Sequence, residues 1–102
     1  ETVEESIQIE ILNGCGVSKL ASKGRDFMRD RKFDVVDIAN TKKTSDRSIV
    51  IDRLGDIESA RKAALAMGIS DTLIITEIDS SLYLRASVII GKDYKDLEPF
   101  KK

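Results

Sequence analysis

Apolar and polar residues alternate over five segments of the chain, and this alternation predicts strands because successive side chains of a strand point to opposite faces. The predicted strands cover residues 7–12, 33–39, 48–54, 73–78 and 86–90. Two further segments repeat apolar residues at helical spacing, which predicts amphipathic helices over residues 17–28 and 57–67. The second helix begins after Gly55-Asp56 and ends at Gly68, residue types that are typical of helix ends.

This order of elements predicts an α+β fold. Strand, helix, strand, strand, helix, strand is the order of the ferredoxin-like β-α-β-β-α-β sandwich, here with one additional strand. We therefore expect two helices on one face of a mainly antiparallel sheet, with the strand of residues 7–12 in its interior. Residues 33–56 are expected to form one hairpin and the last two strands another. Gly24, in the apolar stripe of the first helix, is expected to let that helix approach the sheet closely.

The length of 102 residues fits a single domain. We expect a polar lead-in at residues 1–6, a folded domain at 7–94 and a polar tail at 95–102. Seventeen basic and eighteen acidic residues nearly cancel, which argues against nucleic acid as a partner and leaves only local attraction for anions. No apolar run approaches the ~18 residues of a membrane span, so we expect no direct membrane insertion by this segment.

The chain contains no histidine, and this lowers the expectation of an enzyme. Acid–base catalysis near neutral pH would need a carboxylate, lysine or thiolate with a shifted pKa. Cys15 is the single cysteine, and without a histidine to activate it a structural thiol is favoured over a nucleophile. We expect no catalytic residue, no metal and no cofactor.

The glycine turn between the first strand and the first helix is the best candidate for a binding site. Its glycines allow backbone angles that expose amide groups at a helix start, where anions bind. In the expected topology this turn, the polar loop of residues 40–47 and the connection of residues 70–72 share one end of the sheet. The candidate ligand-binding residues are Asn13, Gly14, Cys15, Gly16, Lys42, Lys43 and Arg47. An ordinary solvated loop is the alternative and is favoured, because surface lysines are common.

Three sharper interpretations have less support. Gly14-Cys15-Gly16 followed by Asp37 imitates a dinucleotide-binding fingerprint, but the third glycine is missing and the chain is short for a doubly wound sheet. RNA binding would need aromatic side chains along the strands, and these are absent from the middle of the predicted strands. Asp93, Asp96 and Glu98 could gather a divalent ion only weakly, so a solvated tail is favoured there.

The sequence resembles the LytR C-terminal domain family over about residues 7–94. The resemblance is carried by Ile11-Leu12-Asn13-Gly14-Cys15-Gly16, by Leu20-Ala21, by Phe33-Asp34-Val35, by an alanine-rich second helix and by Val88-Ile89-Ile90-Gly91-Lys92-Asp93-Tyr94. That family often has glycine before the Leu-Ala pair, where this chain has Lys19. We therefore expect a tighter or differently aimed turn between strand and helix.

The closing signature Gly91-Lys92-Asp93-Tyr94 has a structural and a ligand-binding interpretation, and the structural one is favoured. The strand would stop at Gly91, Asp93 would accept turn hydrogen bonds and Tyr94 would cover the edge of the core. If the last strand takes the fourth ferredoxin-like position, this signature lies opposite the turn of residues 13–16. If the last strand is an added edge, the two meet at one end. The sequence leaves both arrangements open.

The resemblance implies an extracytoplasmic bacterial domain in the periplasm or at the cell surface, tethered to the membrane through a segment outside this chain. Such domains often accompany the LytR-CpsA-Psr phosphotransferase domain, which no segment here resembles. We therefore expect a non-enzymatic accessory domain that binds or positions peptidoglycan, an anionic glycopolymer or an envelope protein. The alternative is a structural spacer that self-associates weakly through an edge strand.

Overall fold

The computed structural model describes residues 6–101. Within them the chain forms five strands, namely β1 (Gln8–Asn13), β2 (Asp34–Asn40), β3 (Ile49–Asp52), β4 (Ile74–Thr76) and β5 (Ala86–Ile90). Two α-helices, α1 (Leu20–Asp30) and α2 (Ile57–Met67), and short 3₁₀ turns complete this part of the chain. Each predicted helix and strand is present, because each segment carries the hydrophobic period of its element, although α1 begins three residues later than predicted.

The sheet topology differs from the predicted one. The strand order is β2-β1-β5-β3-β4, with β1 parallel to β2 and β5, β3 parallel to β4, and only β3 and β5 antiparallel. The fold is α+β with β1 in the sheet interior, as expected, but the ferredoxin-like order and the mainly antiparallel sheet are wrong. The reason is that each helix is a crossover inside a β-α-β unit, which brings its two strands side by side and parallel.

The two predicted hairpins are also wrong. β2 and β3 are separated in the sheet by β1 and β5, so residues 33–56 cross the sheet instead of turning back. β4 lies at one edge beside β3, whereas β5 lies in the centre between β1 and β3. The last strand is therefore neither the fourth ferredoxin-like strand nor an added edge strand.

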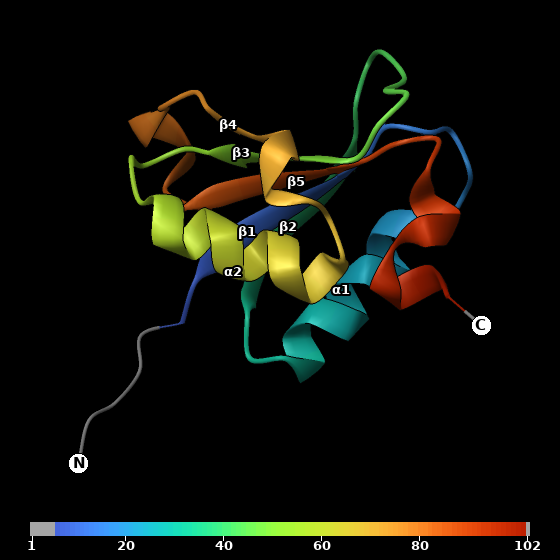
Figure 1. Ribbon diagram of the computed structural model, residues 1–102, viewed down its shortest axis with the longest axis horizontal. Helices are drawn as coiled ribbons and strands as arrows, with labels where there is room; N and C mark the ends of the chain where they lie inside the picture. The colour runs from blue at the N-terminus through green and yellow to red at the C-terminus, as the bar shows by residue number, and fades with distance from the viewer. Residues whose placement is uncertain (1–5, 102) are drawn as a thin grey trace.

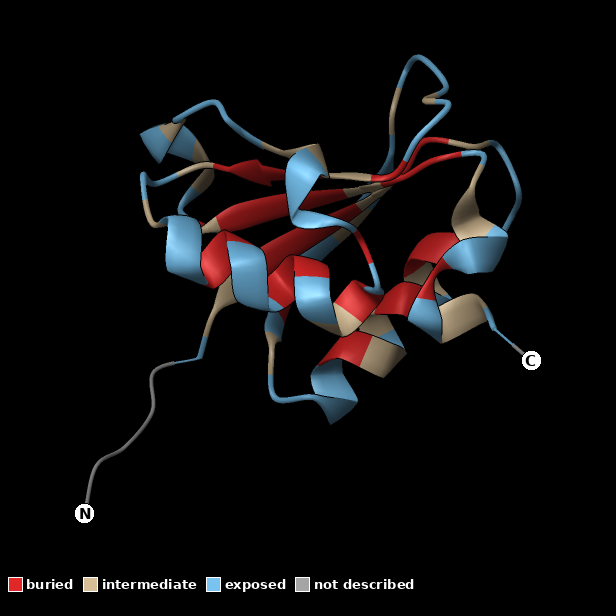
Figure 2. Ribbon diagram, viewed as in Figure 1, coloured by how far each residue is buried: buried red, intermediate tan, exposed pale blue. Residues whose placement is uncertain are grey.

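Both helices cover the same face of the sheet (Figure 1). The buried residues line the space between the sheet and the helices (Figure 2), and the largest of them are Ile9, Ile11, Met28, Met67 and Ile90. Gly24 faces this core: a β carbon there would lie 3.5 Å from Cδ1 of Ile11 and 3.6 Å from Cδ1 of Ile90. The glycine thus allows the expected close approach, although the distances would also accommodate a methyl group in ordinary contact.

The turn into α1 contains a strained residue. Lys19 precedes the helix with a φ of 71°, in the left-handed region that disfavours an L-residue by about 1–2 kcal/mol. No side chain caps the helix at this residue. A glycine would adopt the same backbone without strain.

The end of the described chain is part of the core. We expected a polar tail over residues 95–102, but Leu97 is only 2% exposed and belongs to the core cluster. The rings of Tyr94 and Phe100 pack edge to face with 5.8 Å between their centroids, and both contact the core. The segment after the closing signature therefore covers the core beside α1. Of the expected lead-in at residues 1–6, residues 1–5 lie outside the described part.

Candidate functional site

The strand–helix turn and the closing signature meet at one end of the sheet. β1 and β5 are parallel neighbours, so residues 13–16 and 91–94 leave the sheet at the same edge. β3 is antiparallel to β5 and begins at this edge, so the loop of residues 40–47 ends there. Backbone amides join the segments by donating to carbonyls, Thr41 to Asn13 (3.0 Å), Ser45 to Gly14 (2.6 Å) and Lys92 to Ser45 (2.9 Å). We call this end of the sheet the carboxyl edge.

The polar groups of the glycine turn are used inside the turn. Asn13 is 6% exposed, and its Oδ1 accepts the backbone N–H of Cys15 at 3.1 Å. Its Nδ2 donates to the carbonyl of Val17 at 2.6 Å. The half-buried Cys15 directs its thiol at the same Oδ1, 3.4 Å away. The side chain of Asn13 therefore fixes the backbone between β1 and α1, which is a structural role.

The charges of the carboxyl edge partly cancel. Lys42 and Lys43 are exposed in the loop. Nε of Arg47 lies 3.4 Å from Oδ2 of Asp93, and Nζ of Lys92 lies 3.6 Å from Oδ1 of Asp46. The structure thus brings the predicted residues together at one edge but adds two carboxylates to them, which weakens the attraction for an anion.

The closing signature is tied to the start of β3. Oδ1 of Asp93 accepts the backbone N–H of Ser48 at 2.8 Å and its hydroxyl at 2.6 Å. The backbone N–H of Gly91 donates to Oγ of Ser48 at 2.9 Å. Ser48 is fully buried, so these bonds satisfy groups that water does not reach. Asp93 accepts a backbone hydrogen bond as expected, but from Ser48, the residue before β3, and not from its own turn.

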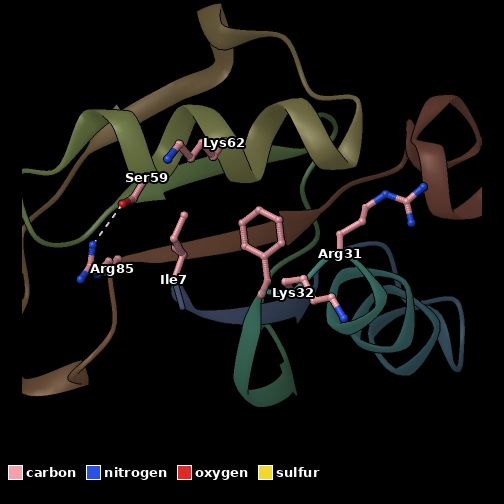
Figure 3. Close-up of a pocket in the computed structure, with 7 residues that line it drawn as sticks. Ile7, Arg31, Lys32, Ser59, Lys62 and Arg85 are labelled. Carbon is pink, nitrogen blue, oxygen red and sulfur yellow. Dashed lines mark hydrogen bonds between the residues drawn. The ribbon is translucent and has the colours of Figure 1, made fainter. Parts of the chain in front are cut away.

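The opposite edge of the sheet carries a pocket that the sequence did not reveal. Its volume is about 400 Å³, and its lining residues are Ile7, Arg31, Lys32, Phe33, Ser59, Lys62 and Arg85. Ile7, Phe33 and Arg85 each directly precede a strand, and these strands, β1, β2 and β5, are parallel neighbours. Figure 3 shows that the remaining side chains come from α2 and from the turn after α1. We call this site the cationic pocket, because four of its seven lining residues are basic and none is acidic.

Backbone hydrogen bonds fix the floor of the cationic pocket. The amide of Arg85 donates to the carbonyl of Gln8 at 2.8 Å, and the amide of Asp34 donates to that of Ile7 at 3.0 Å. Ile7 and Phe33 are half-buried and pack against the core, which gives the pocket an apolar floor. The lining residues therefore come from the starts of three neighbouring strands, from α2 and from the turn after α1.

Two of the four cations are already engaged. Nη1 of Arg85 lies 3.2 Å from Oδ2 of Asp56 and 3.4 Å from Oγ of Ser59. The pKa of Asp56 is lowered, mainly by hydrogen bonds from the side chain and backbone of Ser59 and further by the charge of Arg85. The guanidinium of Arg31 lies 3.5 Å from the ring centroid of Phe27, a cation–π contact.

Lys32 and Lys62 supply the uncommitted charge. Both are exposed, and neither forms an ion pair with another residue of the 6–101 range. Lys32 has a φ of 71° and lies in the turn that ends α1, where its amide donates to the carbonyl of Arg29 at 3.0 Å. Lys62 lies in the middle of α2. Among the lining residues that the structure describes, four are basic and none is acidic, and Asp56 pairs with one of the four.

Two other findings describe residues 6–101. No group of three or more histidine, cysteine, aspartate or glutamate side chains there is arranged to hold a metal ion. The helices of this part are too short and too polar to cross a membrane.

One comparison with known proteins gives a match. The family model described as LytR cell envelope-related transcriptional attenuator matches residues 6–94, which include the glycine turn, the cationic pocket and the closing signature. No curated protein and no solved structure matches the chain.

Proposed function

We propose, since this chain belongs to the LytR_C family of cell-envelope-related domains, that it is a non-enzymatic, extracytoplasmic accessory domain that binds an anionic polymer of the bacterial envelope. The observation that carries the proposal is the cationic pocket, whose four basic lining residues come from α2, from the start of β5 and from the turn after α1. Such a site would position the polymer for a neighbouring domain or hold a tethered protein at the wall.

The arrangement of charge supports an anionic ligand. The whole chain has a net charge of −1, so it presents no general attraction for polyanions. Basic side chains gathered around one concave site create a local positive potential, which raises the local concentration of an anion. Because exposed charges are screened beyond a Debye length of about 8–10 Å, the affinity should fall with salt.

The chemistry of the lining residues supports binding over catalysis. Ser59 is the one hydroxyl in the lining, and its Oγ donates to Oδ2 of Asp56 at 2.6 Å. The pKa of that carboxyl is lowered, chiefly by these same hydrogen bonds from Ser59, so Asp56 is a weak base. A serine is activated by a base with a pKa near the working pH, which this pair does not provide.

The experiment compares two double variants that remove the same charge from the two opposite ends of the strands. Lys32→Gln/Lys62→Gln alters the cationic pocket, and Lys42→Gln/Lys43→Gln alters the predicted loop. Isothermal titration with a purified glycerol-phosphate teichoic acid measures affinity at low and moderate salt, with neutral dextran as the control polymer. All four lysines are exposed, so both proteins should remain folded, as circular dichroism will verify.

The pocket variant should lose about 2- to 30-fold in affinity, because each exposed charge contributes roughly 0.2–1 kcal/mol. The loop variant should stay close to the parent. Equal binding of dextran and teichoic acid, or a larger loss in the loop variant, would overturn the proposal.

A structural spacer is the second candidate, favoured by one observation. β2 and β4 are the edges of the sheet, so one side of each lacks a strand partner within the described residues. Unpaired strand edges can recruit a second copy. Sedimentation over a wide protein concentration range tests this: self-association that is insensitive to both lysine variants would support the spacer.

A further inference from the structure

The cationic pocket has two charged ends on separate structural elements. One end consists of Lys62 on α2 and of Arg85 before β5, and the other consists of Arg31 and Lys32 in the turn after α1. In Figure 3, Ile7 lies between these groups, with Arg85 and Ser59 on one side and Arg31 and Lys32 on the other. The nitrogen of Lys62 points toward the side of Arg85, whereas the nitrogens of Arg31 and Lys32 point away from Ile7, so these exposed side chains would rotate to face a ligand over the floor.

We infer that the pocket recognises two anionic groups at once, one on each side of a sugar-sized neutral unit. The ligand class is a doubly anionic saccharide, such as one repeat of a glycopolymer with a charged group at either end. This inference rests on the proposed function and specifies the part of the polymer that the pocket binds, one repeat with a charged group at either end.

The floor between the two ends fits an uncharged unit. Ile7 and Phe33 form an apolar surface there and are held by the core. A charged group placed over this surface would lose hydration without gaining a partner, whereas the less polar face of a sugar ring loses little. The neutral part of the ligand therefore belongs over the floor, and its charges belong at the ends.

The size of the cavity supports the same ligand. A volume of about 400 Å³ lies within the range of roughly 300–1,000 Å³ that is usual for small-molecule sites. A single inorganic phosphate would occupy one end and leave the other cation unpaired. A sugar with an anion at each end can reach both.

Lys32 and Lys62 are the anchors of the two ends. Arg85 is already bound to Asp56, and Arg31 lies against Phe27. The two lysines, by contrast, have no ion-pair partner within the described chain.

The test uses defined probes instead of polymer. Glucose 1,6-bisphosphate carries two phosphates across one sugar, glucose 6-phosphate carries one, and inorganic phosphate lacks the sugar. Digalacturonate carries carboxylates in place of phosphates. Amide NMR titrations measure the affinity of each probe for the parent protein and for Lys32→Gln, Lys62→Gln and the matched control Lys42→Gln.

We expect the bisphosphate to bind the parent about 1.5- to 5-fold more tightly than the monophosphate, the contribution of one additional exposed charge. Either pocket variant alone should reduce bisphosphate binding to the level of the monophosphate, and Lys42→Gln should not. Tight binding of digalacturonate with the same lysine dependence would also support two-ended recognition, with uronic acids as the source of charge.

Equal affinity for bisphosphate and monophosphate, or dependence on only one lysine, would overturn the inference. Either result is compatible with polymer binding at the pocket, so the proposed function would survive it. Conversely, selective bisphosphate binding without any teichoic acid binding would overturn the proposed function and leave two-ended recognition standing.

Discussion

Replacement of Gly91 by alanine should severely destabilise the domain. A β carbon at this position would lie 2.5 Å from the carbonyl carbon of Arg47, 2.6 Å from its oxygen and 2.8 Å from the amide nitrogen of Ser48. These are backbone atoms, so no side-chain rotation can relieve the overlap. The backbone at Ser48 is itself held by Asp93. One of the two strand ends must therefore move.

The expected loss follows from two effects. Forcing a methyl group into a filled site costs roughly 1–3 kcal/mol. A shift at Ser48 would also break hydrogen bonds of a fully buried residue, at about 1–3 kcal/mol for each unsatisfied group. We expect a loss of about 3 kcal/mol or more, a large share of the ~5–15 kcal/mol that stabilises a typical domain.

Gly24→Ala is the matched control for this substitution. Its added β carbon would meet no atom closer than 3.5 Å among the contacts of the site, so the methyl group fits. Alanine is the better helix former by about 1 kcal/mol, so this variant should be equally or more stable than the parent. Urea denaturation followed by circular dichroism measures both. Ordinary surface substitutions change the free energy of unfolding by no more than about 0.5 kcal/mol. If Gly91→Ala changes it by no more than this, the reasoning is refuted.

Three further predictions concern single residues. Oδ1 of Asp52 accepts hydrogen bonds from three successive backbone amides of the turn into α2, at 3.1, 2.9 and 3.0 Å. Asp52→Ala should therefore lower the free energy of unfolding, measured by urea denaturation, by about 2–4 kcal/mol. Asp52→Asn should lower it clearly less, because asparagine keeps an acceptor oxygen. The pKa of Asp56 is lowered from its ordinary value of 3.8 by hydrogen bonds from Ser59 and then by the charge of Arg85. The ionised carboxylate therefore stabilises the fold above pH 3.8, and this stabilisation is lost as the pH falls below 3.8 toward the pKa of the folded state. Asp56→Asn should flatten the acid limb of the stability–pH curve, and an unchanged limb would contradict the assignment. Lys19→Gly should raise stability by about 1 kcal/mol because it relieves the left-handed lysine, and a loss of stability would show that this backbone is not strained.

The elements could be predicted from the sequence because each has its own hydrophobic period, but the pairing of the strands could not. A buried strand alternates in the same way whether its neighbours are parallel or antiparallel. The informative segment was β5, whose residues Ala86, Ser87 and Val88 are all fully buried, as is typical of a central strand. The turn-forming residues that precede it predict a hairpin instead.

The same error explains which parts of the site were predicted. The carboxyl edge was found because residues 13–16 and the 40–47 loop meet there in both topologies. The cationic pocket depends on β1, β2 and β5 being parallel neighbours, which brings together residues 7, 33 and 85. Its basic residues are far apart in the sequence and each one alone has the pattern of an ordinary surface charge.

The most direct test of the binding proposal is a map of amide chemical shifts during titration with soluble teichoic acid. Binding in the cationic pocket predicts saturable shifts in residues 31–33, 59–62 and 85, weakened by salt. Shifts confined to residues 13–16 and 40–47, or no saturable shift, would contradict it.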